Sequence, residues 1–536
     1  MSKKGIHKWA SGQLSQTEKI GQLFMPAAFI NDTEVEIQKL ERLITEHNIG
    51  GICFFHSRAS AATNYEGKKE VIYYKDSFDT LKQLISRYQK AAKYPLLIAI
   101  DAEWGLAMRI ENTPQYPYAI TLGAIQDNDD LIFEVGQNIA RDCKAAGIHW
   151  NLAPVADINN NPDNPVIGYR SFGENKDSVL EKTMAFIKGS QSEGVLTSIK
   201  HFPGHGDTAT DSHLGLPLIN KSKQELLENE LYPFQKLIDE GVDSVMVGHL
   251  SVPSLAHGTP IPSSISKDII KGLLREEMGF EGLVISDALN MHAVSKNYPK
   301  QGELEWLAFD AGNDILCFAE HPKEGIETIL ENATPDQIQE SFERIWKLKK
   351  RVFSIHETSS SPNLESSVGL NTRLAKKSLT LLKGTESKIR EFSAANFLGI
   401  EISRSTDNLF FELIGKGKEF DYSTFPKFER VDDTKLITAK KNILLALFPP
   451  QIKPTNKFGL SKEELEFINE MIATENTILY VFGNPYVLNH IDSENANAVV
   501  MVYQDFKVFQ EVAAQHFLGN LESKGNLPIT HKEFQK

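Results

Sequence analysis

The sequence lacks several features that assign a protein to a class at once. It has three cysteines in 536 residues, too few and too scattered for a disulfide framework. No C-x-x-C pair suggests zinc binding or redox chemistry, so we expect Cys53, Cys143 and Cys317 to be small buried side chains. No stretch approaches the roughly 18 consecutive apolar residues of a membrane span. No G-x-G-x-x-G or P-loop turn follows the first predicted strand, so the usual signal of nucleotide binding is missing.

Positive charge is also in short supply. Lysine and arginine total 57 against 71 aspartates and glutamates, which gives a net charge of −14. A surface this acidic repels phosphate backbones, so we expect no nucleic-acid partner. The first residues are basic, but no apolar segment follows them. We therefore expect a cytoplasmic protein, or a periplasmic or secreted one if a signal peptide has been removed.

What is present predicts two α/β domains. Hydrophobic residues make up 41% of the chain and charged residues 24%, a composition typical of compact proteins, and the length suits one large and one smaller domain. Up to about residue 355, eight short apolar runs alternate with amphipathic helical patterns: 22–29, 50–55, 96–101, 149–156, 195–202, 244–250, 282–288 and 314–318. Such a series predicts an N-terminal (β/α)8 TIM-type barrel over residues 1–355, with an open doubly wound sheet as the alternative.

The remainder of the chain predicts a smaller α/β sandwich domain. Serine and proline interrupt both periodicities around 357–367, so we place a linker at 356–369 and the second domain at 370–536. Strand-like runs at 396–401, 442–448, 477–483 and 497–503 are separated by helical patterns. This alternation favours a parallel sheet.

Charged residues gather where the predicted barrel strands end, which is where barrel enzymes hold their working groups. The third run ends in Asp101 and Glu103, the fourth leads to Asp157 and Arg170, the fifth ends in Lys200 and His201, the sixth in His249, and the seventh in Ser286 and Asp287. A structural ion pair explains any one of these residues equally well. Their convergence on one rim predicts a catalytic site.

The segment from Lys200 to His213 contains the densest set of polar residues and supports two interpretations. His201, His205, Asp211 and His213 are ligand types for a metal, but their spacing is not that of a helical zinc motif and Lys200 would oppose a cation. Alternatively, Asp211 and His213 form an acid/base pair in which the carboxylate orients the imidazole. A nucleophile would then come from elsewhere.

Asp287 is the best placed carboxylate for that role. An aspartate gains little by attacking an amide, but it can trap a sugar at its anomeric carbon as a glycosyl-enzyme. The residues therefore favour cleavage of a glycoside.

These motifs resemble one known family. KHFPGHGD (200–207) with DSH (211–213), VISDALNM (284–291) and GYRSFG (168–173) are similar to the β-N-acetylglucosaminidase branch of glycoside hydrolase family three. The likeness runs from about residue 18 to about 353. AKKSLTLLKG (375–384) and FGNPY (482–486) resemble the C-terminal α/β sandwich of that family.

The resemblance implies retaining cleavage of terminal β-linked N-acetylglucosamine, without metal or organic cofactor. It implies that Asp287 is the nucleophile, His213 the acid/base and Asp211 its partner. Residues in matching positions would bind the sugar hydroxyls: Asp101, Arg109, Arg170, Lys200 and His201. The implied substrates are small carbohydrates, namely N-acetylglucosaminides and especially the muropeptides of peptidoglycan recycling.

Several alternatives stay open. Chitin oligomers are a second substrate class, and phosphate replaces water as acceptor in some relatives, which makes the enzyme a phosphorylase. A β-glucosidase of the same family and a non-catalytic carbohydrate-binding barrel are further alternatives, and the oligomeric state is open. Trp104 stands where many members have glycine, which affects the length of the substrate. We expect His205 to shape its loop, His249 to be a satisfied core histidine or a ring ligand, and Asp157 to pair locally.

Overall fold

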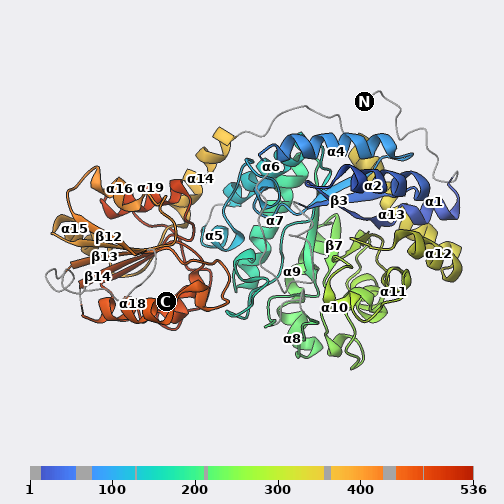
Figure 1. Cartoon of the computed structure of the whole chain (residues 1–536). Coiled ribbons are helices and arrows are strands. Elements are labelled where there is room, and N and C mark those ends of the chain that lie inside the picture. Colours follow the sequence, from blue (N-terminus) through green and yellow to red (C-terminus); the bar gives the residue numbers. More distant parts are fainter. Residues whose placement is uncertain are drawn as a thin grey trace. The chain divides into compact units, whose positions relative to one another are not determined.

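The computed structural model describes residues 14–55, 75–126, 129–209, 215–354, 364–425, 442–474 and 476–534 (Figure 1). The chain forms two compact units. Unit 1 comprises Met1–Tyr116, Ile132–Ile158 and Thr183–Leu364, and unit 2 comprises Pro117–Leu131, Asn159–Lys182 and Glu365–Lys536. Among the described helices, none has the length and apolar content needed to cross a membrane.

Unit 1 is built on a curled parallel sheet. Seven strands follow one another in chain order: β2 (Ala27–Phe29), β3 (Gly51–Phe55), β4 (Leu97–Ile100), β5 (Trp150–Asn151), β6 (Leu196–Phe202), β7 (Ser244–Val247) and β8 (Leu283–Ser286). Nearly all their residues are buried, as strands covered by crossover helices must be. Their carboxyl ends therefore share one edge of the sheet.

The first and last predicted runs form a separate parallel pair, β1 (Phe24–Met25) and β9 (Leu316–Cys317). Pro26 divides the first run into β1 and β2, since proline has no N–H to donate to a neighbouring strand. Backbone bonds from Ser286 N to the Ile315 carbonyl (3.0 Å) and from Leu289 N to the Cys317 carbonyl (3.0 Å) join β8 to β9. The predicted barrel-type fold is thus confirmed, as a seven-stranded curled sheet plus this pair.

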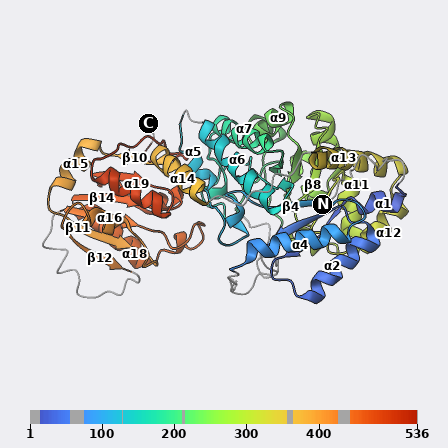
Figure 2. The same cartoon turned by 90° about the horizontal axis from the view of Figure 1, so that it is seen from above.

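Helices cover the outside of the sheet (Figures 1 and 2). A capping box begins the first helix, because Ser15 Oγ accepts from Glu18 N and Glu18 Oε2 accepts from Ser15 N. Residues 268–277 form a π-helix. Helices α2 and α4 pack side by side. The longer helices, two of which begin in unit 2, are α1 (Gln16–Gly21), α2 (Glu34–His47), α4 (Ser77–Ala91), α6 (Asp129–Ala146), α7 (Lys176–Ser192), α8 (Lys223–Glu228), α9 (Leu231–Asp239), α11 (Glu303–Ala311), α12 (Pro322–Asn332) and α13 (Pro335–Ser354).

Unit 2 contains a six-stranded sheet. Its strand order is β10 (Thr380–Lys383), β15 (Ala498–Met501), β14 (Asn476–Val481), β13 (Asn442–Leu447), β11 (Leu398–Ile402) and β12 (Asp421–Phe425). The predicted parallel α/β sandwich is confirmed, with one antiparallel edge strand, β10. Neither edge strand, β10 or β12, was predicted.

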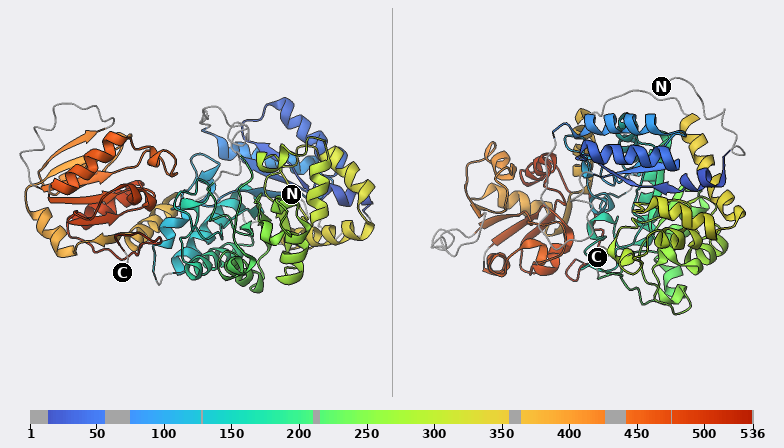
Figure 3. Two further views of the ribbon diagram at one scale, coloured as in Figure 1. Left: turned by 90° about the horizontal axis from the view of Figure 1, so that it is seen from below. Right: turned by 45° about the vertical axis from the view of Figure 1, so that its right-hand side comes forward.

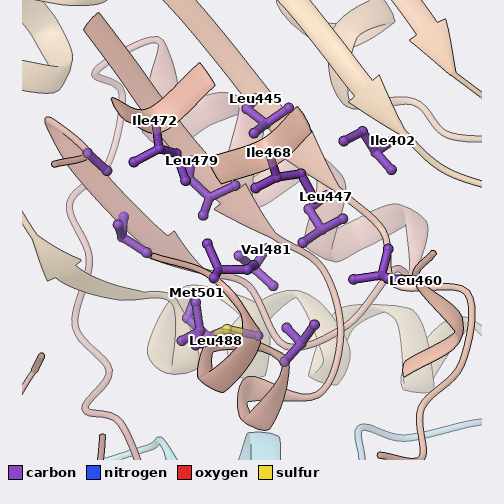
Figure 4. Packing of buried hydrophobic residues seen from close by; sticks show 14 of the residues in the cluster. Ile402, Leu445, Leu447, Leu460, Ile468, Ile472, Leu479, Val481, Leu488 and Met501 are labelled. Atoms are coloured by element: carbon purple, nitrogen blue, oxygen red, sulfur yellow. The ribbon is translucent and has the colours of Figure 1, made fainter. Parts of the chain in front are cut away.

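Helices lie on both faces of this sheet: α16 (Phe410–Gly415) and α19 (Lys507–Phe517) on one, and α18 (Lys462–Thr474) on the other (Figures 1 and 3). Alternate residues of β13 serve the two faces. Leu445 and Leu447 pack with Ile468 and Ile472 of α18 (Figure 4), whereas Leu444 belongs to the opposite cluster. Burial on both faces explains the continuous apolar runs from which these strands were predicted.

Two segments before residue 355 belong to unit 2 rather than unit 1, namely 117–131 with helix α5 (Ala119–Gly123) and 159–182. Helix α14 (Leu364–Ser378) begins within the predicted linker. Residues 355–363 lie outside the described residues. The boundaries 1–355, 356–369 and 370–536 stay predictions.

Candidate active site

Four charged side chains form an ion-pair network where β4 and β6 end. Asp101 directly follows β4, and its Oδ1 accepts from Lys200 Nζ on β6 at 2.9 Å. Arg109 Nη2 donates to the other oxygen, Oδ2, also at 2.9 Å. Glu103 Oε1 lies 2.8 Å from Lys200 Nζ. Two cations thus balance two carboxylates in one polar group.

The network keeps Asp101 ionised. Burial alone would raise the pKa of its carboxyl, but the charges of Lys200 and Arg109 outweigh burial and lower the pKa to about 2. Lys200 is only 2% exposed, so its ammonium depends on these carboxylates for compensation. Asp101 is therefore a hydrogen-bond acceptor throughout the pH range in which enzymes work.

His201 is held by a buried aspartate. Its Nδ1 lies 2.7 Å from Asp157 Oδ2, and its backbone N donates to the same carboxylate. Burial would raise the pKa of Asp157, but His201 and His205 lower it. Because Nδ1 faces a carboxylate, it carries the proton and the ring orientation is fixed. The local pairing predicted for Asp157 is confirmed.

His205 and His249 make internal contacts. His205 N donates to Asp157 Oδ1 at 2.7 Å, and its Nδ1 lies 2.8 Å from Thr208 Oγ1. His249 Nδ1 lies 2.6 Å from Ser264 Oγ, and its Nε2 lies 2.9 Å from the Ala288 carbonyl oxygen. These contacts fit the predicted role of His205 in shaping its loop. For His249 they fit the satisfied core histidine, one of its two predicted roles.

Asp287 follows β8 and is half-buried. Its backbone N donates to the Val247 carbonyl of β7 at 2.9 Å, and its Oδ1 accepts from Ala288 N at 2.7 Å. The loop that follows lines a cavity of about 280 Å³ together with His321 from the loop after β9. The nucleophile predicted from the sequence therefore lies at the carboxyl edge of the sheet, and the cavity is lined by residues that follow it in the chain.

The buried thiol of Cys317 on β9 senses the charges of carboxylates at this edge of the sheet. A hydrogen bond with Cys53 and burial raise the pKa of Cys317, and the charges of Asp101 and Asp287 raise it further. Both carboxylates are thus within electrostatic reach of one buried thiol. The structure brings Asp101, Arg109 and Lys200 together, and Asp287 lies at the same carboxyl edge of the sheet.

Three phenylalanines at the ends of neighbouring strands form an aromatic cluster at the same edge. The ring centroids of Phe29, Phe55 and Phe318 lie 5.3–6.0 Å apart. The Arg109 guanidinium lies 5.2 Å from the centroid of the Phe55 ring. This stacking fixes the side chain that also holds Asp101.

The structure does not place three of the predicted site residues beside the ion-pair network. Asp211 and His213 lie outside the described residues, which end at 209 and resume at 215. Arg170 belongs to unit 2, where it ends the short 3₁₀-helix η4 (Gly168–Arg170) and its Nη1 donates to the Val166 carbonyl at 3.1 Å. Among the described residues, no three or more His, Cys, Asp or Glu side chains are grouped to hold a metal ion.

Sequence reasoning missed the roles of Glu103 and the aromatic cluster. Glu103 was noted only as the second acidic residue after a strand, and its pairing with Lys200 joins positions 97 residues apart. Phe55 and Phe318 each close an apolar strand run at the predicted rim. That position is the signal that could have identified them.

A curled parallel α/β sheet that carries carboxylates and cations at its carboxyl edge is typical of barrel enzymes. The chain belongs to glycoside hydrolase family 3, since the family model "Glycosyl hydrolase family 3 N terminal domain" matches residues 15–348. The predicted class, a glycoside hydrolase, is confirmed.

Relatives support the branch named from the motifs. "Beta-hexosaminidase A" of Pseudoalteromonas piscicida is 31% identical over 343 residues, which cover 59% of this chain and 55% of that protein. "Beta-hexosaminidase" of Tolumonas auensis is 33% identical over 287 residues, which cover 52% of this chain and 79% of that protein. A solved family 3 β-N-acetylglucosaminidase from Paenibacillus sp. str. FPU-7 superposes with a TM-score of 0.78 at 26% identity, covering 96% of this chain and 99% of that one. The chain thus spans little more than half of the Pseudoalteromonas protein.

Proposed function

We propose that this protein is an exo-acting β-N-acetylglucosaminidase that removes terminal β-linked N-acetylglucosamine from muropeptides. The observation that carries the proposal is the carboxyl edge of the barrel sheet, where Asp287 follows β8 and the network of Asp101, Arg109 and Lys200 lies at the ends of β4 and β6. The names of the hexosaminidase relatives support the sugar. The muropeptide substrate rests on the resemblance of the motifs.

The ion-pair network suits recognition of sugar hydroxyls. Ionised Asp101 accepts hydrogen bonds, while Lys200 and Arg109 donate them. The resemblance of the motifs assigns Arg170 a role as a further donor. His201 contributes Nε2, because Asp157 occupies its Nδ1. The network of two cations and two carboxylates has no net charge.

In the mechanism that we propose, Asp287 attacks the anomeric carbon and forms a covalent glycosyl ester. His213 protonates the departing oxygen of the aglycone. A water molecule then attacks the same carbon, His213 takes its proton, and Asp287 leaves as a carboxylate. Asp211 orients His213 throughout. Two inversions at one carbon retain the β configuration.

One incubation series tests this function. The whole protein is incubated with 4-nitrophenyl β-N-acetylglucosaminide, with the matching β-glucoside, with a muropeptide and with chitobiose, each with and without phosphate. We expect free N-acetylglucosamine, first released as the β anomer, from the N-acetylglucosaminides but not from the glucoside. An α anomer would refute the retaining mechanism, and turnover of chitobiose but not the muropeptide would refute the proposed substrate.

The same series separates the remaining alternatives. Sugar 1-phosphate formed only in phosphate would identify a phosphorylase, and preference for the glucoside would identify a β-glucosidase. Binding without turnover would identify a carbohydrate-binding barrel. Asp287→Asn, assayed in parallel, shows that any turnover belongs to this protein.

A further inference from the structure

The loop that carries Arg170 is cross-linked by its own residues. It runs from Asn159 to Glu174 and belongs to unit 2. Asn164 Oδ1 accepts from the backbone N of Val166 and Ile167 at 2.9 and 2.8 Å. These bonds shape the turn just before η4. They do not, by themselves, fix the base of the loop.

A tyrosine from the C-terminal part of unit 2 holds that base. Tyr486 lies in the 3₁₀-helix η9 (Pro485–His490), within the FGNPY motif after β14. Its hydroxyl accepts from Asn159 Nδ2 at 2.7 Å and donates to Glu174 Oε1 at 2.9 Å. Asn159 and Glu174 are the two ends of the loop. One hydroxyl therefore ties both ends together.

The bonds on either side of this hydroxyl extend the connection. Asn159 Oδ1 accepts from Gly168 N, the first residue of η4, at 2.9 Å. The second oxygen of Glu174 accepts from Thr530 N at 2.7 Å. Gly168 and Arg170 are the first and last residues of η4, so a short chain of bonds leads from Tyr486 to the arginine.

The environment makes these bonds strong. Tyr486 and Asn159 are 1% and 0% exposed, so water does not compete for them. Burial and the charge of Glu174 raise the pKa of Tyr486, and its hydroxyl keeps the proton that it donates. Loss of this hydroxyl leaves the half-buried carboxylate of Glu174 and the buried amide of Asn159 with one partner fewer each.

We propose that Tyr486 is a positioning residue for Arg170, through which the C-terminal part of unit 2 fixes a sugar-binding arginine. Tyr486 itself touches no substrate in this account. The proposal rests on the function proposed above, because it uses the role of Arg170 in binding the sugar. It gives the FGNPY motif a task in binding, beyond a structural one.

The test is a double-mutant cycle in the full-length protein with 4-nitrophenyl β-N-acetylglucosaminide. Tyr486→Phe keeps the ring and removes only the hydroxyl. We expect kcat/KM to fall about tenfold, with the change divided between kcat and KM as in Arg170→Ala. The double variant should be no worse than Arg170→Ala alone, since a misplaced arginine and a missing one lose the same contact.

Tyr480→Phe is the matched control. Tyr480 is also fully buried in unit 2, and its hydroxyl lies 2.8 Å from His516 Nδ1. Its loss should lower the melting temperature as Tyr486→Phe does, yet leave kcat/KM within about twofold of the wild type. If Tyr486→Phe fails to fold, Glu174→Gln is the second variant, because an amide cannot accept from both Tyr486 and Thr530 through separate oxygens.

The outcomes separate this proposal from the function on which it rests. Absence of activity in the wild type would overturn the function. A folded Tyr486→Phe protein with wild-type kcat/KM, or losses that multiply in the double variant, would overturn the positioning role alone. An Arg170→Ala variant with wild-type kinetics would also overturn the positioning role.

Discussion

Asp287 is oriented by its neighbours before any substrate arrives. Its N–H donates to the Val247 carbonyl, its Oδ1 accepts from Ala288 N, and His249 Nε2 lies 2.9 Å from the Ala288 carbonyl oxygen. A carboxylate fixed in this way loses little conformational entropy when it attacks. The residue thus combines a position at the barrel rim with a defined orientation.

Replacement of Asp287 tests its role most simply. We expect Asp287→Asn to lower kcat by at least about 10³-fold, because an amide cannot form the covalent ester. The melting temperature should change little, since the isosteric side chain still accepts from Ala288 N. Asp239→Asn, at the exposed end of α9, is the control and should keep wild-type kcat. A kcat near wild type in Asp287→Asn would refute the assignment.

The role of His213 stays a prediction and is tested through the leaving group. His213→Ala should damage substrates with poor leaving groups far more than activated aryl glycosides, because only the former need protonation. The measurement is kcat/KM for a series of aryl β-N-acetylglucosaminides of rising phenol pKa. The slope against leaving-group pKa should become steeper in the variant. Equal losses across the series would indicate a role in binding instead.

Helices α6 and α7 approach closely because glycines lie at their contact in unit 1. A Cβ on Gly136 would lie 2.2 Å from the Phe186 carbonyl oxygen, and one on Gly189 would lie 2.0 Å from that of Phe133. Ser190 Oγ donates to the Gly136 carbonyl at 3.2 Å. Backbone atoms cannot move aside as a flexible side chain can, so the two helices would have to separate.

Alanine at two glycines should therefore have opposite effects on stability. We expect Gly189→Ala to lower the free energy of unfolding by about 1–3 kcal/mol, as overpacking does. Gly272 lies in the π-helix, and a Cβ there would meet no atom within 4 Å. Gly272→Ala should therefore raise the free energy of unfolding by about 0.4–1 kcal/mol. Urea denaturation of the three proteins measures both changes. A neutral Gly189→Ala would contradict the close contact.

Helix α13 brings a buried lysine to the opposite, amino-terminal edge of the barrel sheet. Lys349 is 1% exposed, and its Nζ donates to Gln22 Oε1 at 2.5 Å and to the Pro95 carbonyl at 2.8 Å. Both partners are neutral. Burial lowers the pKa of Lys349 to about 7.

This lysine should make stability rise with pH. Unfolded lysine has a pKa of about 10.4, so between pH 7 and pH 10 the unfolded chain binds more protons than the folded one, and the free energy of unfolding increases. The slope from one group is at most about 1.4 kcal/mol per pH unit. Urea denaturation between pH 7 and pH 10 should show this rise in the wild type and in Lys350→Met, an exposed neighbour, but not in Lys349→Met. Equal slopes would contradict the account.

For the whole molecule, strand positions were largely predictable because both sheets are covered on two faces, which leaves continuous apolar runs. The edge strands were not predictable: β10 continues a helical pattern, and β12, with Tyr422 52% exposed, has too little burial to leave such a run. Segments 117–131 and 159–182 join unit 2 through contacts distant in sequence, such as Gln504 Nε2 with Thr121 Oγ1 at 2.7 Å. Local periodicity carries no signal of that kind.

The residues of the site also include some that the sequence could predict and some that it could not. Asp101, Lys200 and Asp287 could be proposed because parallel strands bring their carboxyl ends to one edge. The partners that set their chemistry, such as Glu103 for Lys200, depend on which strands and loops meet in space. The sequence therefore indicated which residues lie at the carboxyl edge of the sheet, and the structure showed which of them form ion pairs.

Trapping the covalent intermediate tests the central claim most directly. The protein is incubated with a 5-fluoro-N-acetylglucosaminyl fluoride, which slows the second step more than the first, then digested and analysed by mass spectrometry. The account predicts one added sugar, attached to the peptide that contains Asp287, and no label in Asp287→Asn. A label on Asp101 or Glu103, or full inactivation without any covalent sugar, would contradict it.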